Sequence, residues 1–323
     1  MKEEDIRPRA IFDEYLRLAE RDTRMYFAES DRRAVRCPAC GAQGRSSFVK
    51  NGFAYEECPA CQTLFVSPRP PAEAFSRYYR ESESAQYWAS TFYRETAEAR
   101  REKLWKPKSR LVHEMLADRG GYVLLDIGGG YGIFAEEFHR VSGTPVTVIE
   151  PGPALAEVCR GRGLAVIERF LETVAAAELP PGPKAFVSFE LFEHLHDPEA
   201  FCRHLHGLMG SGDRFIFTTL SGTGADIQAL WEDAKAVSPP HHLNFLNPTS
   251  VRLLLERVGF DVVSVTTPGK LDVDILANGR EHIKDRFWRT FIAQADDRAR
   301  ANMQTFLAAN GLSSHMMVLC QRP

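Results

Sequence analysis

The pattern of apolar and polar positions divides the chain at about residue 122. Beyond this point, short apolar runs alternate with segments whose apolar residues recur at helical spacing. The apolar runs predict strands at 122–127, 145–150, 164–168, 185–189, 213–219 and 260–266. The helical spacing predicts helices at 132–141, 153–161, 198–209 and 248–258. Strands and helices that alternate in this way are typical of a parallel sheet covered on both faces, so we expect an α/β fold.

The remaining segments indicate how the chain is organised around this fold. Residues 9–29, 72–118 and 281–309 are expected to be helical, and the apolar run HMMVLCQ near the end is expected to be a last strand. The proline-rich stretch SPRPP is expected to be a stiff link. We therefore expect an N-terminal helix in 1–33, a cysteine module in 34–70, a helical lid or linker in 71–118, and the α/β domain in 119–323 with a helical insertion at 281–309.

Composition and charge narrow the class of protein. The 323 residues are 44% hydrophobic and 26% charged, which is typical of a soluble globular protein. Forty basic residues against 43 acidic ones give a net charge of −3, which argues against a surface built to hold nucleic acid. No run of 18 apolar residues occurs, and the N-terminus MKEEDIRPRA has no apolar segment, so we expect no membrane span and no secretory signal. The expected location is the cytoplasm, and the oligomeric state stays open.

Four of the seven cysteines occur as two CPAC motifs, and the other three stand alone in apolar surroundings. Two such turns bring four thiolates within reach of one ion, which suits tetrahedral Zn²⁺. Asn51-Gly52 between the motifs is a hairpin signal, so we expect a zinc ribbon. Four thiolates leave no open coordination position, so the zinc would be structural. The expected ligands are Cys37, Cys40, Cys58 and Cys61.

The stretch LLDIGGGYG predicts a backbone turn that a ligand approaches closely. Asp126 ends a predicted strand, and glycines follow at alternate positions, Gly128, Gly130 and Gly132. A dinucleotide-binding turn would carry another glycine where Ile133 stands, and no GK[ST] follows for a phosphate-binding loop. The turn therefore argues against a dinucleotide and excludes a phosphate-binding loop, and a purely structural glycine turn is the alternative to a cofactor site.

Together with Glu150 at the end of the next strand, this turn resembles that of the class I S-adenosylmethionine-dependent methyltransferases, over residues 85–323. The resemblance implies a doubly wound, Rossmann-like, seven-stranded sheet with an antiparallel last strand. It implies that Glu150 accepts the ribose hydroxyls of S-adenosylmethionine, and that Glu168, Arg169 and Phe170 are candidates near the adenine. The expected contacts to the amino-acid end of the cofactor are Asp126, Gly128, Gly129, Gly130, Tyr131 and Gly132.

The stretch FVSFELFEHLHDP resembles the fourth strand of this family and the loop that faces the transferred methyl group. Glu190, Glu193 and His194 would share one face of a helical turn, where two carboxylates and an imidazole suit a hard divalent ion. The pattern is similar to that of ubiquinone-pathway O-methyltransferases and small-RNA 3′-end methyltransferases, in which it binds Mg²⁺ or a similar ion. His241 or His242 would complete such a site.

The same residues allow two other interpretations. His194 with its neighbours is a candidate general base or substrate contact, since an acceptor must lose a proton as it attacks, and Glu190 is also a candidate cofactor contact. A purely structural role for this loop also stays open, because the motif is widespread in the superfamily without a metal.

Residues 78–105 are rich in tyrosine, tryptophan and arginine, and we expect them to close the pocket. Arg94, Arg100 and Arg101 are candidates to meet a carboxylate or phosphate, and an ordinary amphipathic helix is the alternative. The order of modules, with TPGKLDVDIL, is similar to methyltransferases of bacterial polysaccharide and natural-product pathways. That resemblance implies a small-molecule or glycan acceptor, such as a nucleotide-linked sugar, with Lys270 or Arg280 near its phosphate.

Two further functions stay open at this point. The zinc ribbon is a candidate reader of RNA or protein, although few basic residues lie within it. The chain is also a candidate non-catalytic scaffold that keeps the methyltransferase fold, although the intact glycine turn argues against that.

Overall fold

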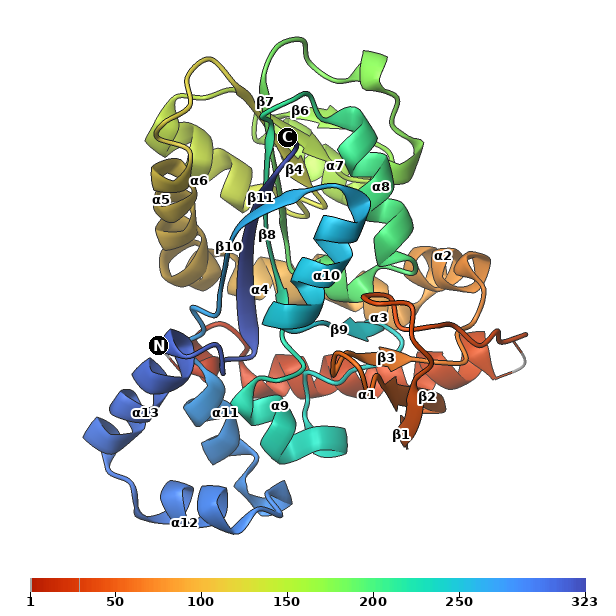
Figure 1. Cartoon of the computed structure of the whole chain (residues 1–323), viewed down its shortest axis with the longest axis vertical. Coiled ribbons are helices and arrows are strands. Elements are labelled where there is room, and N and C mark those ends of the chain that lie inside the picture. Colours follow the sequence, from red (N-terminus) through yellow and green to blue (C-terminus); the bar gives the residue numbers. More distant parts are fainter. Residues whose placement is uncertain (1, 29) are drawn as a thin grey trace.

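A seven-stranded sheet stands upright in the upper part of the molecule (Figure 1). The structure is a computed structural model, and it describes residues 2–28 and 30–323. The strand order is β10-β11-β8-β7-β4-β5-β6, in which β11 alone runs antiparallel to its neighbours within the described residues. The strands are β4 (Val123–Ile127), β5 (Val146–Ile149), β6 (Ala165–Ile167), β7 (Lys184–Phe189), β8 (Arg214–Leu220), β10 (Asp261–Thr266) and β11 (His315–Gln321). The predicted sheet and its antiparallel last strand are therefore confirmed.

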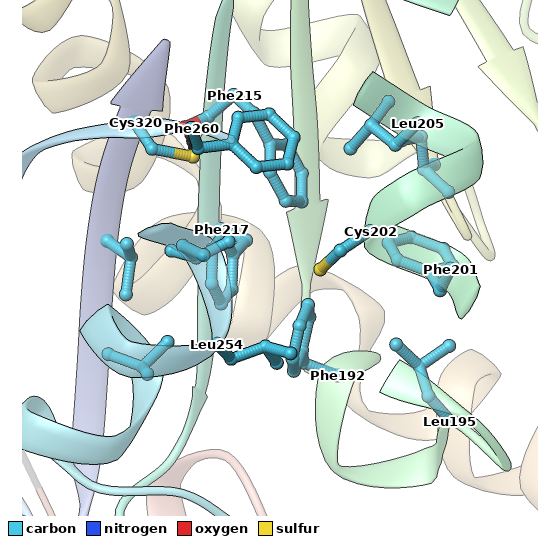
Figure 2. Close-up of a cluster of buried hydrophobic side chains, with 14 of the residues drawn as sticks. Phe192, Leu195, Phe201, Cys202, Leu205, Phe215, Phe217, Leu254, Phe260 and Cys320 are labelled. Carbon is cyan, nitrogen blue, oxygen red and sulfur yellow. Dashed lines mark hydrogen bonds between the residues drawn. The ribbon is translucent and has the colours of Figure 1, made fainter. Parts of the chain in front are cut away.

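Helices cover both faces of this sheet. One face packs against α5 (Lys106–Met115), α6 (Ile133–Ser142) and α7 (Pro153–Gly161). The other packs against α8 (Pro198–Leu208) and α10 (Pro248–Val258). Figure 2 shows that second core, in which the rings of Phe192 and Phe217 stack 4.6 Å apart and the thiols of Cys202 and Cys320 lie among apolar side chains. Apolar runs buried on both faces are what a parallel sheet requires.

The cysteine module forms a second, smaller sheet with the order β1-β2-β3-β9. Its hairpin joins β1 (Arg45–Lys50) to β2 (Phe53–Glu57) through a two-residue turn in which Asn51 and Gly52 have φ of 46° and 75°. These angles are the ones that an Asn-Gly hairpin turn requires. The strand β3 (Leu64–Val66) then pairs with β9 (Asn244–Phe245), which was not predicted and which comes from the α/β part of the chain.

The first third of the chain adds further helices, of which the first crosses the molecule below the sheet (Figure 1). They are α1 (Arg9–Phe27), α2 (Ala72–Glu81), α3 (Glu83–Tyr87) and α4 (Tyr93–Arg100), with π-helical turns at Trp88–Phe92 and Arg101–Trp105. The predicted first helix ended at residue 29, which lies outside the described residues. Single π-helical turns within helices are common beside functional sites.

The C-terminal third adds helices that the sequence pattern defined poorly. The predicted insertion at 281–309 is two helices, α12 (Arg286–Gln294) and α13 (Asp297–Ala309), because the Asp296 side chain caps α13 at the Ala299 amide. Neither α9 (Ala225–Leu230) nor α11 (Asp272–Asn278) was predicted. Single 3₁₀ turns lie at Glu3–Asp5, Leu171–Thr173, Ala176–Glu178, Phe192–His194, Trp231–Asp233 and Arg280–His282. No helix in the described part of the chain is both long and apolar enough to cross a membrane.

Candidate functional site

A small pocket opens at the carboxyl end of β4, beside the glycine turn. This edge of a parallel sheet is where α/β folds bind their ligands. Its lining is mostly aromatic and glycine, with one carboxylate, and it comprises Tyr93, Trp105, Asp126, Gly128, Gly129, Tyr131, Ile133, Phe134 and Phe189. Four of these residues are among the predicted contacts of the cofactor.

The glycine turn is shaped by backbone angles and by close packing. The alternating glycines 128, 130 and 132 have φ of 69°, 55° and 68°, which L-residues with a side chain rarely adopt. A Cβ on Gly129 would lie 2.7 Å from Val148 Cγ1 and 2.9 Å from Asp126 Oδ2. The turn therefore exposes bare peptide groups to the pocket because no side chain fits there.

Two buried carboxylates flank this turn. Asp126 is 2% exposed, and its Oδ2 has no hydrogen-bond partner in the described structure. Burial, helped by the charge of Glu150, raises the pKa of Asp126 to about 7. Glu150 accepts hydrogen bonds from the backbone N–H of Gly130 at 3.0 Å and of Gly152 at 2.9 Å, and burial raises its pKa. An unpaired carboxylate oxygen at the pocket suits a ligand that brings a hydrogen-bond donor.

The lid contacts the pocket through two aromatic residues that the sequence did not single out. Tyr93 stacks on Tyr131 with ring centroids 5.2 Å apart, and Trp105 packs 6.2 Å from the ring of Phe189. Tyr93 therefore packs directly on the glycine turn, since a Cβ on Gly130 would lie 3.2 Å from its hydroxyl. The aromatic richness of residues 78–105 was the signal for a lid, but the spacing did not show which rings face inward.

The three candidate arginines of the lid have different surroundings. Arg101 is held by Glu136 at 2.8 Å and by Glu137, both on α6, so it ties the lid to the sheet domain. Arg94 is exposed beside Glu95. Arg100 is buried beside the rings of Phe92 and Trp105.

The adenine candidates lie on the loop after β6, outside the pocket lining described above. Arg169 is exposed and pairs with Glu178 at 3.4 Å, and Glu168 pairs with Arg160 at 2.7 Å. The Phe170 ring is 56% exposed. Lys270 and Arg280, proposed near a phosphate, are likewise exposed.

Glu190 follows β7 in a strained conformation with φ of 55°. Its carboxylate accepts a hydrogen bond from Thr218 Oγ1 at 2.7 Å and lies 3.4 Å from His315 Nδ1 and 3.8 Å from Lys108 Nζ. Burial acts to raise the pKa of Glu190, but the charges of His315 and Lys108 outweigh it, so the pKa is lowered. Glu190 is therefore an ionised, fully engaged carboxylate.

The expected face of Glu190, Glu193 and His194 is not formed, because the helical turn covers only Phe192–His194. The structure instead groups Glu193 and His194 with His242, with one ligand atom of each within 4.8 Å of the others. Glu193 accepts a hydrogen bond from Thr219 Oγ1 at 2.8 Å, and burial together with the charge of Glu190 raises its pKa. The prediction that Glu190 shares a face with Glu193 and His194 is therefore wrong, and Glu190 lies beside this group instead.

The tautomer of His242 is fixed by the backbone. Its Nδ1–H donates to the carbonyl of Ala236 at 2.5 Å, which leaves Nε2 with a free lone pair. The His194 ring lies 4.8 Å away. Burial lowers the pKa of His242 to about 4 and also lowers that of His194, so both imidazoles are neutral at physiological pH. Neutral imidazoles beside a carboxylate can accept a proton or bind a divalent ion.

His241 belongs to a different network. Its Nε2 forms a 2.7 Å hydrogen bond with the Tyr78 hydroxyl, which also bonds to Ser84. Its ring packs 5.3 Å from Tyr15 and 5.7 Å from Tyr79. His241 therefore connects the loop that carries His241 and His242 (the histidine loop) to the N-terminal helices, and of these two residues His242 is the one grouped with Glu193.

The four predicted zinc ligands converge. Their Sγ atoms lie within 4.8 Å of one another, with Cys37 and Cys61 3.5 Å apart and Cys40 and Cys58 3.4 Å apart. Tetrahedral Zn–S bonds of about 2.3 Å place sulfurs roughly 3.8 Å apart. Each knuckle ends in a left-handed residue, Gly41 or Gln62, whose backbone N–H donates to the carbonyl of Cys37 or Cys58 and closes the turn. This donor set fits a structural zinc.

The cysteine module is bonded directly to the histidine loop. The Tyr55 hydroxyl donates to the backbone carbonyl of His242 at 2.7 Å, and Asn247 Nδ2 donates to the carbonyl of Cys61 at 2.7 Å. The buried guanidinium of Arg69 donates to Asn244 Oδ1 at 2.9 Å. With the β3–β9 pairing, these bonds hold the loop on both sides of His242.

Sequence reasoning missed the residues that reach the site from distant segments. Thr218 and Thr219 could have been found, because they lie at the carboxyl end of a predicted strand, β8, which pairs with β7. Nothing in the sequence pattern pointed to Lys108 or His315, because their role depends on how α5 and β11 pack.

The chain matches one family model and is similar to several known proteins. The family model described as "Methyltransferase domain" matches residues 96–265. The curated ubiquinone biosynthesis O-methyltransferases of Xanthomonas euvesicatoria pv. vesicatoria (strain 85-10) and Xanthomonas oryzae pv. oryzae (strain PXO99A) are both 27% identical, over 157 and 160 residues. The matches cover 45% and 46% of this chain and 65% and 66% of those relatives, so the chain spans about two thirds of their length. Among solved structures, the plantazolicin methyltransferase BpumL in complex with SAH is similar at a TM-score of 0.48 and 11% identity, covering 77% of this chain and 94% of that one.

Proposed function

Because the chain belongs to the methyltransferase-domain family, with the sheet of class I S-adenosylmethionine-dependent methyltransferases, we propose that it transfers a methyl group from S-adenosylmethionine to a hydroxyl of a small-molecule or glycan acceptor. The observation that carries this proposal is the pocket at the glycine turn, and the buried group of Glu193, His194 and His242 supplies candidate chemistry for the acceptor. The O-methyltransferase names of the curated relatives support an oxygen acceptor.

The residues at the pocket fit the donor. The unpaired Oδ2 of Asp126 would accept from an ammonium group, and Glu150 would accept from ribose hydroxyls in place of its bonds to backbone N–H groups. When bound, S-adenosylmethionine supplies an electrophilic methyl group on a sulfonium. The rings of Tyr93 and Trp105 exclude water from that end of the pocket.

The acceptor hydroxyl has to lose its proton as its oxygen takes the methyl group. His242 Nε2 is placed to receive that proton, since its Nδ1–H is already committed to Ala236. Alternatively, Glu193, His194 and His242 would hold a divalent ion that binds the acceptor oxygen and lowers its pKa. Removal of metal separates the two mechanisms. A chelator that spares the ribbon zinc should abolish activity only if a divalent ion binds the acceptor oxygen.

The packing of the zinc ribbon favours a small-molecule acceptor over an RNA or protein acceptor. Its sheet is continued by β9 and its Tyr55 side chain bonds to the histidine loop, so the ribbon is committed to holding that loop. Lys50, one of its few cations, is turned inward and donates to the carbonyl of Ala234 at 2.9 Å. A nucleotide-linked sugar remains our leading glycan acceptor.

The test is incubation with S-adenosylmethionine labelled in its methyl group and a panel of hydroxylated acids, phenols and nucleotide-linked sugars. We expect transfer to one class, lost in His242→Gln and retained in His206→Gln, a histidine on the far end of α8. Transfer to RNA or protein alone, or equal transfer by both variants, would contradict the proposal.

A further inference from the structure

Three cations reach the inner side of the lid from different segments: Arg7 before α1, Arg100 at the end of α4 and Lys108 in α5. Lys108 has counterparts, since its Nζ donates to Thr218 Oγ1 at 3.2 Å and lies 3.8 Å from Glu190. Glu190 is in turn shared with His315. The negative charge of Glu190 is therefore already paired with Lys108 and His315.

Arg100 has no such counterpart. It is only 8% exposed, and its guanidinium carbon lies 5.7 Å from the Phe92 ring and 5.8 Å from the Trp105 ring. Its side chain forms no hydrogen bond or ion pair with any residue that the structure describes, and its Nε is buried. A guanidinium removed from water without an anion is costly, so this position calls for one.

Arg7 brings a second unpaired guanidinium to the same place. It lies 5.5 Å from the ring of Phe12, which packs 6.4 Å from Phe92 beside Arg100. Its Nε is also buried without a partner among residues 2–28 and 30–323. Burial dominates the pKa of His242 and of Glu193, but the charge of Arg7 also acts on both. The charge of Arg7 therefore reaches the group that we assign to the acceptor.

We propose that Arg7 and Arg100 together bind an acid group, a carboxylate or a phosphate, carried by the acceptor. The proposal rests on the proposed function and names its substrate class. Two guanidiniums supply planar pairs of N–H donors that match either anion, and the surrounding rings exclude water and strengthen the attraction. The methionine carboxylate of the cofactor offers the same chemistry, so the experiment has to separate the two sources.

The experiment is calorimetric titration of inorganic phosphate into the full-length protein saturated with S-adenosylhomocysteine. Wild type and Arg94→Gln, which removes an exposed arginine of the same helix, are expected to bind phosphate equally. Arg7→Gln and Arg100→Gln are each expected to weaken it by about tenfold or more, the loss of a charge-assisted hydrogen bond. Arg100→Lys keeps the charge, so its affinity for phosphate is expected to lie between those of wild type and Arg100→Gln. This partial recovery would show that the loss in Arg100→Gln is not a folding defect.

The affinity for S-adenosylhomocysteine is measured on the same variants. Unchanged affinity in Arg7→Gln and Arg100→Gln assigns the pair to the acceptor. A loss of cofactor affinity with phosphate binding retained assigns it to the cofactor and overturns the proposal, as does equal phosphate binding by all variants. Failure of wild type to bind S-adenosylhomocysteine would instead refute the proposed function itself.

Discussion

The bond between the Tyr55 hydroxyl and the His242 carbonyl allows a one-atom test of how the ribbon supports the site. Tyr55→Phe removes only the donor of that 2.7 Å bond, and the ring stays buried between the ribbon and the loop. Burial raises the pKa of Tyr55, so the hydroxyl is protonated at any working pH and the bond is always present in wild type. The perturbation is therefore confined to the backbone of His242.

A buried carbonyl left without its donor costs about 1–3 kcal/mol, so we expect the free energy of unfolding to fall by that amount. The His242 imidazole should then lose its fixed position, because its carbonyl is no longer held. A displacement of about 1 Å at a reacting group costs roughly 100-fold in rate, so we expect kcat to fall about 10- to 100-fold. The affinity for S-adenosylhomocysteine should stay unchanged, since the glycine turn is not touched.

The assays are urea unfolding, calorimetry with S-adenosylhomocysteine, and methyl transfer to the acceptor found in the labelled panel. Proton NMR adds a direct readout, because the His242 Nδ1–H bonded to Ala236 should exchange faster with water in the variant. The matched control is Tyr122→Phe, a buried tyrosine just before β4 at the opposite end of the sheet. If both variants lose stability and Tyr55→Phe keeps full kcat, the ribbon does not position the histidine loop.

Three further predictions use other parts of the structure. Cys58→Ser should lower the metal content from one zinc per chain to near zero by mass spectrometry, whereas Cys202→Ala, outside the cluster, should keep the zinc; retention in both would show that the thiols do not hold it. Gly130→Val should abolish the thermal shift caused by S-adenosylhomocysteine, while Gly163→Val, with φ of 79° and open space around it, carries a similar backbone strain of about 1–2 kcal/mol and should keep the shift. Burial, helped by a neighbouring carboxylate, raises the pKa of Asp226 from 3.8 to about 8. The folded state then keeps a proton that the unfolded chain has lost, so stability should fall as pH rises from about 4 to about 8, by at most about 1.4 kcal/mol per pH unit, and melting curves of Asp226→Asn should lack that fall.

The sheet was predictable because its signals are local. The buried runs around β4 and β5 are apolar on both faces, and Asn51-Gly52 and the CPAC motifs specify their turns within a few residues. Short elements such as β9 were not predictable, since two residues carry no periodicity and β9 exists only because β3 pairs with it.

The candidate site was predictable in part for the same reason. Asp126 and the glycine turn are contiguous in sequence, and the structure places them at one pocket. The E-x-x-E-H pattern was misleading, because helical spacing assumes a helix and the chain forms a single 3₁₀ turn there. The grouping of His242 with Glu193 depends on contacts across nearly 50 positions, including the hydrogen bond from the Leu243 amide to the Glu193 carbonyl.

The most direct test of the account is calorimetric titration of S-adenosylmethionine into wild type and Asp126→Ala. The account predicts one binding site per chain in wild type and a loss of affinity in the variant, because the unpaired Oδ2 of Asp126 lies at the pocket. No binding heat in a correctly folded wild-type protein, or equal affinity in both, would contradict the assignment of this pocket to the methyl donor.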